Sequence, residues 1–377
     1  MGEFAGAFAS LFAVNMGCRP GERIVVFGDT IRPDEHPEPA DADRRLRLRA
    51  AAEEAALFAQ QTYGDAQFVS SPATAASGAE PPELLWRAVF GETLVDQLLR
   101  TGLLTPLLTK AATPEELQHA RDMVRSERES VAQVVIAMAN NSTSHTRFRD
   151  LVNAAGGRFA SLPHFDPKMF RTSMAVDWQA LAARTERLAK AVNQAVAVEV
   201  TTPNGTRLRI GKEGRMAKGD TGILTAPGSF GNLPAGEVYL APLEGTSEGT
   251  MVIEYGPSRK LAAPLTLQVR GGEVVEIGGE EPHRAWLEQK FNESRLNRNI
   301  AELGIGTNDR ASRPDNILEA EKILGTIHVA LGDNSGFGGR VSTPFHEDYV
   351  FYQPTLTAIM ADGAERVLLR DGVICGS

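Results

Sequence analysis

The chain has 377 residues, of which 42% are hydrophobic and 23% charged, the composition of a globular protein long enough for about two domains. Its 39 Lys and Arg residues against 48 Asp and Glu give a net charge of −9, so we expect no binding of nucleic acid or of an anionic membrane. Two cysteines, Cys18 and Cys375, exclude a disulfide framework and a four-cysteine zinc site.

The apolar segment 4–17 predicts a buried first helix rather than a secretory signal. Glu3 precedes it where a signal would carry positive charge. Its larger side chains recur at helical spacing, at Phe4, Phe8, Leu11, Phe12 and Asn15. No run of about 18 apolar residues follows elsewhere, and we therefore expect a cytoplasmic protein.

The first half of the chain alternates short apolar runs with longer helical patterns. Strands are expected at 21–28, 66–70, 131–138 and 158–162, and helices at 41–61 and 178–195. Strands that alternate with helices are typical of a parallel sheet covered on both faces. The sequence therefore predicts an α/β domain with a mostly parallel sheet over residues 1–192.

The second half is rich in glycine and β-branched residues. An Asn204-Gly205 turn separates two strand-like runs, and the same hairpin pattern recurs at 265–277 and 356–374. Helices are expected only near 282–294 and 313–324. Residues 193–377 are thus predicted to form a β-rich α+β domain.

Two histidines of this second domain lie in strand-like segments. His328 interrupts the apolar run 325–332, where a buried imidazole requires a polar partner. His346 and Asp348 stand two residues apart on an expected strand, so both side chains lie on one face and can bind one metal, while Glu347 points the other way. The alternative for His328 is a core histidine that hydrogen-bonds the backbone.

Two carboxylates lead into apolar runs of the same domain. Glu237 precedes Val-Tyr-Leu, and Glu302 lies within Ile-Ala-Glu-Leu-Gly-Ile-Gly. A buried carboxylate needs a counter-charge, and several together favour a bound cation. The alternative is a simple ion pair, for Glu302 with Arg295 or Arg298. Taken together, the carboxylates and histidines indicate a two-metal hydrolytic centre.

Four segments in chain order, NLPAGEVYLAP, AELGIGTN, EKILGTIHVALG and HED, resemble the aminopeptidase T family of metallopeptidases. The opening MGCRPGERIVV is similar to the start of that family. The resemblance implies that Glu302 bridges two divalent ions and that a glutamate before the strand histidine also binds, here Glu321 or Glu319. This chain differs from the family at Ser335, where the family has a tyrosine. The implied metal ligands are Glu237, Glu302, Glu321, His328, His346 and Asp348.

The resemblance implies a homodimeric aminopeptidase that removes N-terminal residues from small peptides with two divalent ions. Zn²⁺, Co²⁺ and Mn²⁺ all suit mixed histidine and carboxylate ligands. Two alternatives remain on the same fold. One is a mononuclear Fe²⁺ dioxygenase that cleaves dihydroxypyridine rings, and the other is a binding protein without peptidase activity.

Overall fold

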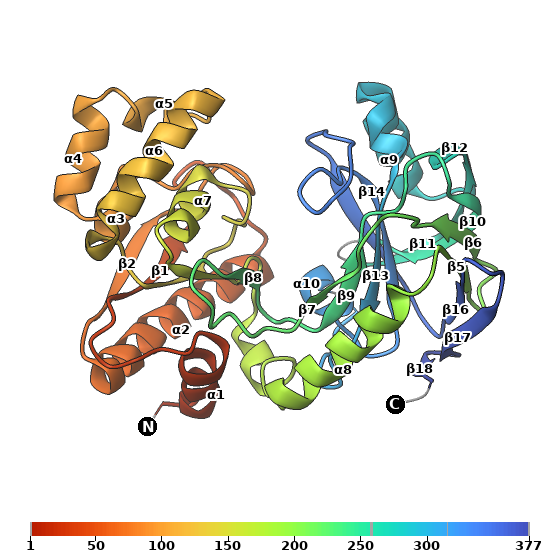
Figure 1. Ribbon diagram of the computed structural model, residues 1–377, viewed down its shortest axis with the longest axis horizontal. Helices are drawn as coiled ribbons and strands as arrows, with labels where there is room; N and C mark the ends of the chain where they lie inside the picture. Colours follow the sequence, from red (N-terminus) through yellow and green to blue (C-terminus); the bar gives the residue numbers. More distant parts are fainter. Residues whose placement is uncertain (1, 257–258, 315, 376–377) are drawn as a thin grey trace. The chain divides into compact units, whose positions relative to one another are not determined.

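The computed structural model describes residues 2–256, 259–314 and 316–375 (Figure 1). The described chain divides into two compact units. The first runs up to Ala175 and includes Gly222–Pro234, and the second comprises Val176–Thr221 and the chain from Ala235 onward. Among the described residues, no helix has the length and apolar character needed to cross a membrane.

The first unit is built on a five-stranded sheet with the order β2-β1-β3-β4-β8, in which every neighbouring pair is parallel. This confirms the predicted α/β domain. Strand β1, which lies between β2 and β3, contains the run Ile-Val-Val-Phe, buried on both faces as an interior parallel strand requires. The strands are β1 (Ile24–Thr30), β2 (Ala66–Pro72), β3 (Val134–Met138), β4 (Arg158–Ser161) and β8 (Phe230–Asn232).

Helices cover both faces of this sheet. The long helix α2 (Pro39–Tyr63) packs on β1 and β2 from one side, and α3 and α7 lie on the other side (Figure 1). Side chains at alternate positions of β1, such as Val25 and Phe27, join the core formed with α3 to α7. The remaining helices are α1 (Ala5–Ser10), continued by a π-helical turn (Leu11–Asn15), α3 (Glu83–Phe90), α4 (Glu92–Arg100), α5 (Leu104–Leu108), α6 (Pro114–Ser126) and α7 (Arg147–Ala154), with 3₁₀ turns at Arg128–Ser130 and Pro167–Arg171.

The second unit contains two antiparallel sheets, which confirms the predicted β-rich domain. The larger has the order β12-β11-β10-β6-β5-β16-β17-β18, and the smaller has the order β15-β14-β13-β9-β7. The strands of the larger sheet are β5 (Ala197–Thr201), β6 (Arg207–Gly211), β10 (Glu248–Tyr255), β11 (Lys260–Arg270), β12 (Glu273–Gly278), β16 (Thr355–Ile359), β17 (Glu365–Arg370) and β18 (Val373–Ile374). Those of the smaller sheet are β7 (Lys218–Asp220), β9 (Glu237–Leu240), β13 (Ile300–Gly306), β14 (Ile327–Gly332) and β15 (His346–Phe351).

One face of the smaller sheet packs into the core of this unit and the other does not. Leu303, Ile305, Val329 and Leu331 join that core together with residues of the larger sheet. Because side chains alternate along a strand, Glu302, Gly304, His328 and Ala330 lie on the opposite face. That face carries the candidate site.

Helices α8 (Trp178–Val192), α9 (Pro282–Glu293) and α10 (Ile317–Ala320), with a 3₁₀ turn at Arg295–Arg298, complete the second unit. The prediction of a helix over 313–324 is wrong except for the short α10. From Glu321 the chain continues as a turn into β14. The predicted domain boundary at residue 192 puts helix α8 in the first domain. In the structure α8 belongs to the second unit, because Leu188 and Val192 join the core of that unit. Conversely, Gly222–Pro234 lies in the first unit, since β8 adds to the parallel sheet beside β4.

Candidate metal centre

The structure brings all six sequence-predicted ligands together. Glu237 begins β9, Glu302 lies in β13, His328 in β14, and His346 and Asp348 in β15. Glu321, the sixth, follows α10. Their donor atoms form three overlapping groups that could each hold a metal ion, which are Glu237–Glu302–His328, Glu302–His346–Asp348 and Glu321–His328–Asp348.

A glycine makes the space that the His328 ring occupies. Gly304 is the residue of β13 directly opposite His328 in the antiparallel register. A Cβ atom at Gly304 would overlap the imidazole ring. The absent side chain therefore lets the ring lie against β13, with Nε2 near the carboxylates of Glu237 and Glu302.

The two imidazoles present their Nε2 atoms to carboxylate oxygens. His328 Nε2 lies 3.2 Å from Glu237 Oε2 and 3.6 Å from Glu302 Oε1. His346 Nε2 lies 3.5 Å from both Glu302 Oε2 and Asp348 Oδ2. The Nδ1 atom of His346 lies 2.8 Å from the backbone oxygen of Asp333, an arrangement that orients a histidine for metal binding through Nε2.

Burial and mutual charge shift the proton affinities of these groups strongly. Burial lowers the pKa of His328, but the Glu302 and Glu237 carboxylates outweigh it and raise the pKa to about 9. Burial likewise opposes protonation of His346, and Asp348 and Glu302 raise its pKa to about 10. The pKa of Asp348 falls to about 2, because the charge of His346 overcomes the effect of burial. Burial raises the pKa of Glu302. Without a metal, the two histidines thus carry the positive charge that the carboxylates require.

A lysine that sequence reasoning missed also belongs to this group. Lys322 is only 2% exposed, and its Nζ lies 2.5 Å from Glu237 Oε1 and 2.8 Å from Glu321 Oε1. These carboxylates hold the pKa of Lys322 well above its ordinary value, against the effect of burial. Burial raises the pKa of Glu321 to about 7 despite the neighbouring ammonium. The one signal in the sequence is the position of Lys322 directly after a candidate ligand.

The donor set fits a divalent cation. Glu237 Oε2 and Asp348 Oδ1 are buried, and neither accepts a hydrogen bond from a described residue; the approach of His328 to Glu237 is an ion-pair contact only. Buried acceptors of this kind are costly unless a cation or a proton satisfies them. Carboxylates combined with imidazoles suit Zn²⁺, Mn²⁺, Co²⁺ and Fe²⁺.

The alternative interpretations of the carboxylates do not describe this structure. Arg295 pairs with Glu273, and Arg298 donates to the backbone oxygen of Val274, so neither compensates Glu302. Of the two candidates before the strand histidine, Glu321 joins the ligand groups, whereas Glu319 accepts a hydrogen bond from the Ser312 backbone.

Two aromatic residues near the ligands were also not predicted from the sequence. Tyr239 lies two residues after Glu237 on β9 and therefore on the same face of the sheet. Burial and the charges of Asp220 and Glu237 raise the pKa of Tyr239 to about 12, so its phenol is neutral. Phe337 lies in the β14–β15 loop with its ring 6.2 Å from that of His346. Strand alternation could have indicated Tyr239, whereas the glycine-rich loop around Phe337 has no periodicity.

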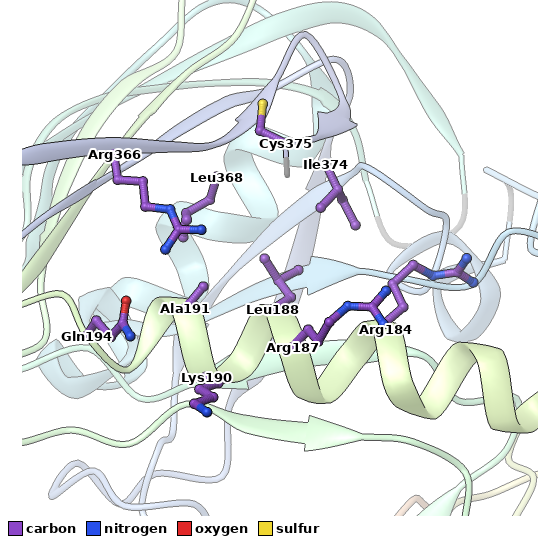
Figure 2. A pocket seen from close by; sticks show the side chains of 10 residues that line it. All are labelled: Arg184, Arg187, Leu188, Lys190, Ala191, Gln194, Arg366, Leu368, Ile374 and Cys375. Atoms are coloured by element: carbon purple, nitrogen blue, oxygen red, sulfur yellow. The ribbon is translucent and has the colours of Figure 1, made fainter. Parts of the chain in front are cut away.

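A separate cavity of about 230 Å³ lies between α8 and the strands β17 and β18. Figure 2 shows that Leu188 on α8 and Leu368 on β17 line it together with basic side chains, among them Arg187 and Arg366. Arg184 donates to Asp309 at 2.6 Å, and Arg187, Lys190 and Arg366 are exposed. The cavity shares no residue with the ligand groups, which remain the candidate site.

Comparisons with known proteins identify the family of this chain. The sequence model of NicX, 2,5-dihydroxypyridine 5,6-dioxygenase, matches residues 105–375, a span that includes every candidate ligand. The chain belongs to this family. No curated protein matches the chain in sequence.

Solved structures share the fold of this NicX family member over its whole length. The 2,5-dihydroxypyridine dioxygenase of Pseudomonas putida KT2440 is 17% identical, with a TM-score of 0.67 over 100% of this chain and 97% of that chain. Wild-type AmpT from Thermus thermophilus is 16% identical, with a TM-score of 0.61 over 99% of this chain and 98% of that chain. At these identities the two structures support the common fold, and the predicted resemblance to aminopeptidase T holds at that level.

Proposed function

We propose that this chain is a metal-dependent oxygenase that opens the ring of a hydroxylated pyridine, with one ferrous ion in the ligand groups around Glu302. Membership of the NicX family supports the reaction class. The mixed histidine and carboxylate ligands support the choice of metal. The charges of the site support a single ion.

The observation that carries the proposal is the buried ammonium of Lys322. It lies within 2.8 Å of both Glu237 and Glu321, and so already supplies a positive charge to two of the six predicted ligands. Lys322 and one divalent ion together supply three positive charges. These balance Glu237, Glu302 and Asp348, and in the metal-free protein burial raises the pKa of the fourth carboxyl, Glu321, to about 7. With a second divalent ion, the site would hold five positive charges against the four carboxylates of Glu237, Glu302, Glu321 and Asp348.

The remaining residues would hold and orient a single ion. His328, His346, Asp348 and Glu302 supply imidazole and carboxylate donors from three adjacent strands, which keeps their spacing fixed. Two histidines with one carboxylate form a recurrent ligand set of non-haem iron oxygenases. When bound, Fe²⁺ supplies the redox chemistry by which dioxygen reacts with an electron-rich ring. The backbone oxygen of Asp333 holds the His346 ring in place through Nδ1.

A two-metal aminopeptidase is the second candidate, because one observation favours it. Glu302 is shared by two of the three groups, one with Glu237 and His328 and the other with His346 and Asp348. A carboxylate in this position is suited to bridge two ions that activate a water and polarise a peptide carbonyl. On this candidate the substrate is a small peptide.

Metal stoichiometry and two activity assays separate the candidates. Metal-free protein is loaded under nitrogen with Fe²⁺, Zn²⁺, Co²⁺ or Mn²⁺, and bound metal is counted by mass spectrometry. The proposal predicts one ion per chain, and consumption of 2,5-dihydroxypyridine with an equal uptake of O₂ by the iron form. Two ions per chain with hydrolysis of aminoacyl p-nitroanilides would overturn it in favour of the peptidase.

The variant Glu302→Gln tests whether the ligand groups are the site. It keeps the side-chain volume but removes one charge shared by two groups, so we expect bound metal to fall at least tenfold while the fold is retained. Glu199→Gln is the control, because Glu199 forms only a surface ion pair with Arg209. Unchanged metal content in Glu302→Gln would contradict the placement of the site.

A further inference from the structure

Three aromatic rings lie together on the face of the smaller sheet that carries the candidate ligands. The Phe337 ring lies 5.9 Å from the Tyr239 ring, at an interplanar angle of 71°, and 6.2 Å from the His346 ring, at 85°. Both are edge-to-face contacts at favourable distances. Tyr239 comes from β9 and His346 from β15, which are separated in the sheet by β13 and β14. A ring that contacts both therefore lies over the two middle strands, where Glu302 and His328 are found.

The loop that carries Phe337 is held firmly at its base. Asn334 is fully buried; its side chain donates to Glu244 Oε1 at 3.1 Å and accepts from the Val341 backbone at 2.9 Å. The Arg340 backbone donates to the same glutamate oxygen at 2.7 Å. Phe337 itself is only half-buried. The loop thus holds an accessible aromatic face in place without needing that ring for its own packing.

The hydroxyl group of Tyr239 has no hydrogen-bond partner within the described part of the chain. It lies on the same face as the ligands and beside the Phe337 ring. A ligand seated against Phe337 would therefore find an apolar ring surface, a phenol donor at its edge and the metal ligands beneath. A planar aromatic ring that carries an oxygen substituent matches these three features, whereas a flexible peptide chain uses the ring surface poorly.

We propose that Phe337, together with the ring of Tyr239, forms an aromatic wall that selects planar aromatic substrates at this site. The inference deepens the proposed function, on which its choice of substrate class rests. It makes Phe337 a specificity-determining residue rather than a metal ligand.

The test compares two chelators that bind a metal in the same way and differ in one ring, benzohydroxamate and acetohydroxamate. Their dissociation constants are measured calorimetrically on the zinc-loaded full chain, in the wild type and in Phe337→Ala, Phe337→Tyr and Ser335→Ala. We expect Phe337→Ala to weaken benzohydroxamate about tenfold and acetohydroxamate less than twofold. Phe337→Tyr should retain the preference because it keeps the ring. Ser335→Ala, an exposed position of the same loop, should match the wild type.

Bound zinc and the melting temperature are recorded for each variant, so that loss of metal or of folding is seen directly. An unchanged ratio of the two dissociation constants in Phe337→Ala would overturn the aromatic wall. Turnover of 2,5-dihydroxypyridine by the iron form is measured separately. Its absence alongside a Phe337-dependent preference for benzohydroxamate would refute the proposed reaction and still support the aromatic site.

Discussion

Replacement of Lys322 by Met tests the charge balance from which a single metal ion is inferred. The substitution keeps an unbranched side chain in a fully buried position but removes the ammonium that Glu237 and Glu321 share at 2.5 and 2.8 Å. Breaking a buried ion pair by removing one partner typically costs about 3–5 kcal/mol, because the other charge stays buried. We expect a loss of that size in the metal-free protein at pH 8.

The loss should depend on pH with a definite sign. Burial already raises the pKa of Glu321 to about 7, and without Lys322 it should rise further. A glutamate whose pKa is higher in the folded than in the unfolded chain binds protons more tightly when folded. Stability therefore falls as the pH rises from the ordinary glutamate value through the folded-state pKa. The Lys322→Met defect should be smaller at pH 5.5 than at pH 8, and a divalent metal ion should reduce it at pH 8.

Lys212→Met is the matched control. Lys212 is also 2% exposed, but its Nζ donates to the backbone oxygen of Ala195 at 3.0 Å, and burial lowers its pKa. Its loss should cost about 1 kcal/mol, the contribution of one hydrogen bond. Urea unfolding gives the change in stability, and amide hydrogen exchange in β13 and β14 reports the second unit separately. A Lys322→Met defect equal to that of Lys212→Met, or equal at both pH values, would refute the reasoning.

Two further predictions concern packing and thiol chemistry. Gly304→Ala should force the His328 ring away from the carboxylates, with a stability loss of about 1–3 kcal/mol and a weaker metal affinity in a calorimetric titration. The control is Gly278→Ala, where the added Cβ meets no atom closer than 3.7 Å, and this variant should retain wild-type metal affinity. Burial raises the pKa of Cys18 to about 12, so at pH 8 only about one Cys18 thiol in ten thousand is ionised. Iodoacetamide followed by peptide mapping should therefore label Cys375 long before Cys18, and equal rates would contradict the raised pKa of Cys18.

The amino-acid sequence by itself predicted the two kinds of domain and five of the candidate ligands, and the resemblance to aminopeptidase T added Glu321. Alternation along β15 was enough to place His346 and Asp348 on one face and Glu347 on the other, where it contacts His283 at 3.2 Å. Local rules succeed here because strand periodicity is set by backbone geometry and is independent of distant residues. The homodimer and the peptidase activity stay predictions.

Tertiary structure decided what local patterns do not contain. Strand β8 joins the first sheet from far along the chain, because only the folded chain brings it beside β4. The expected helix over 313–324 shortened to α10, and the turn after it places Lys322 against Glu237, 85 residues away in the chain. Phe337 reaches Tyr239 through a loop without periodicity. Ion pairs and ring contacts of this kind depend on which strands become neighbours, and that is settled by packing of the whole unit rather than by any one segment.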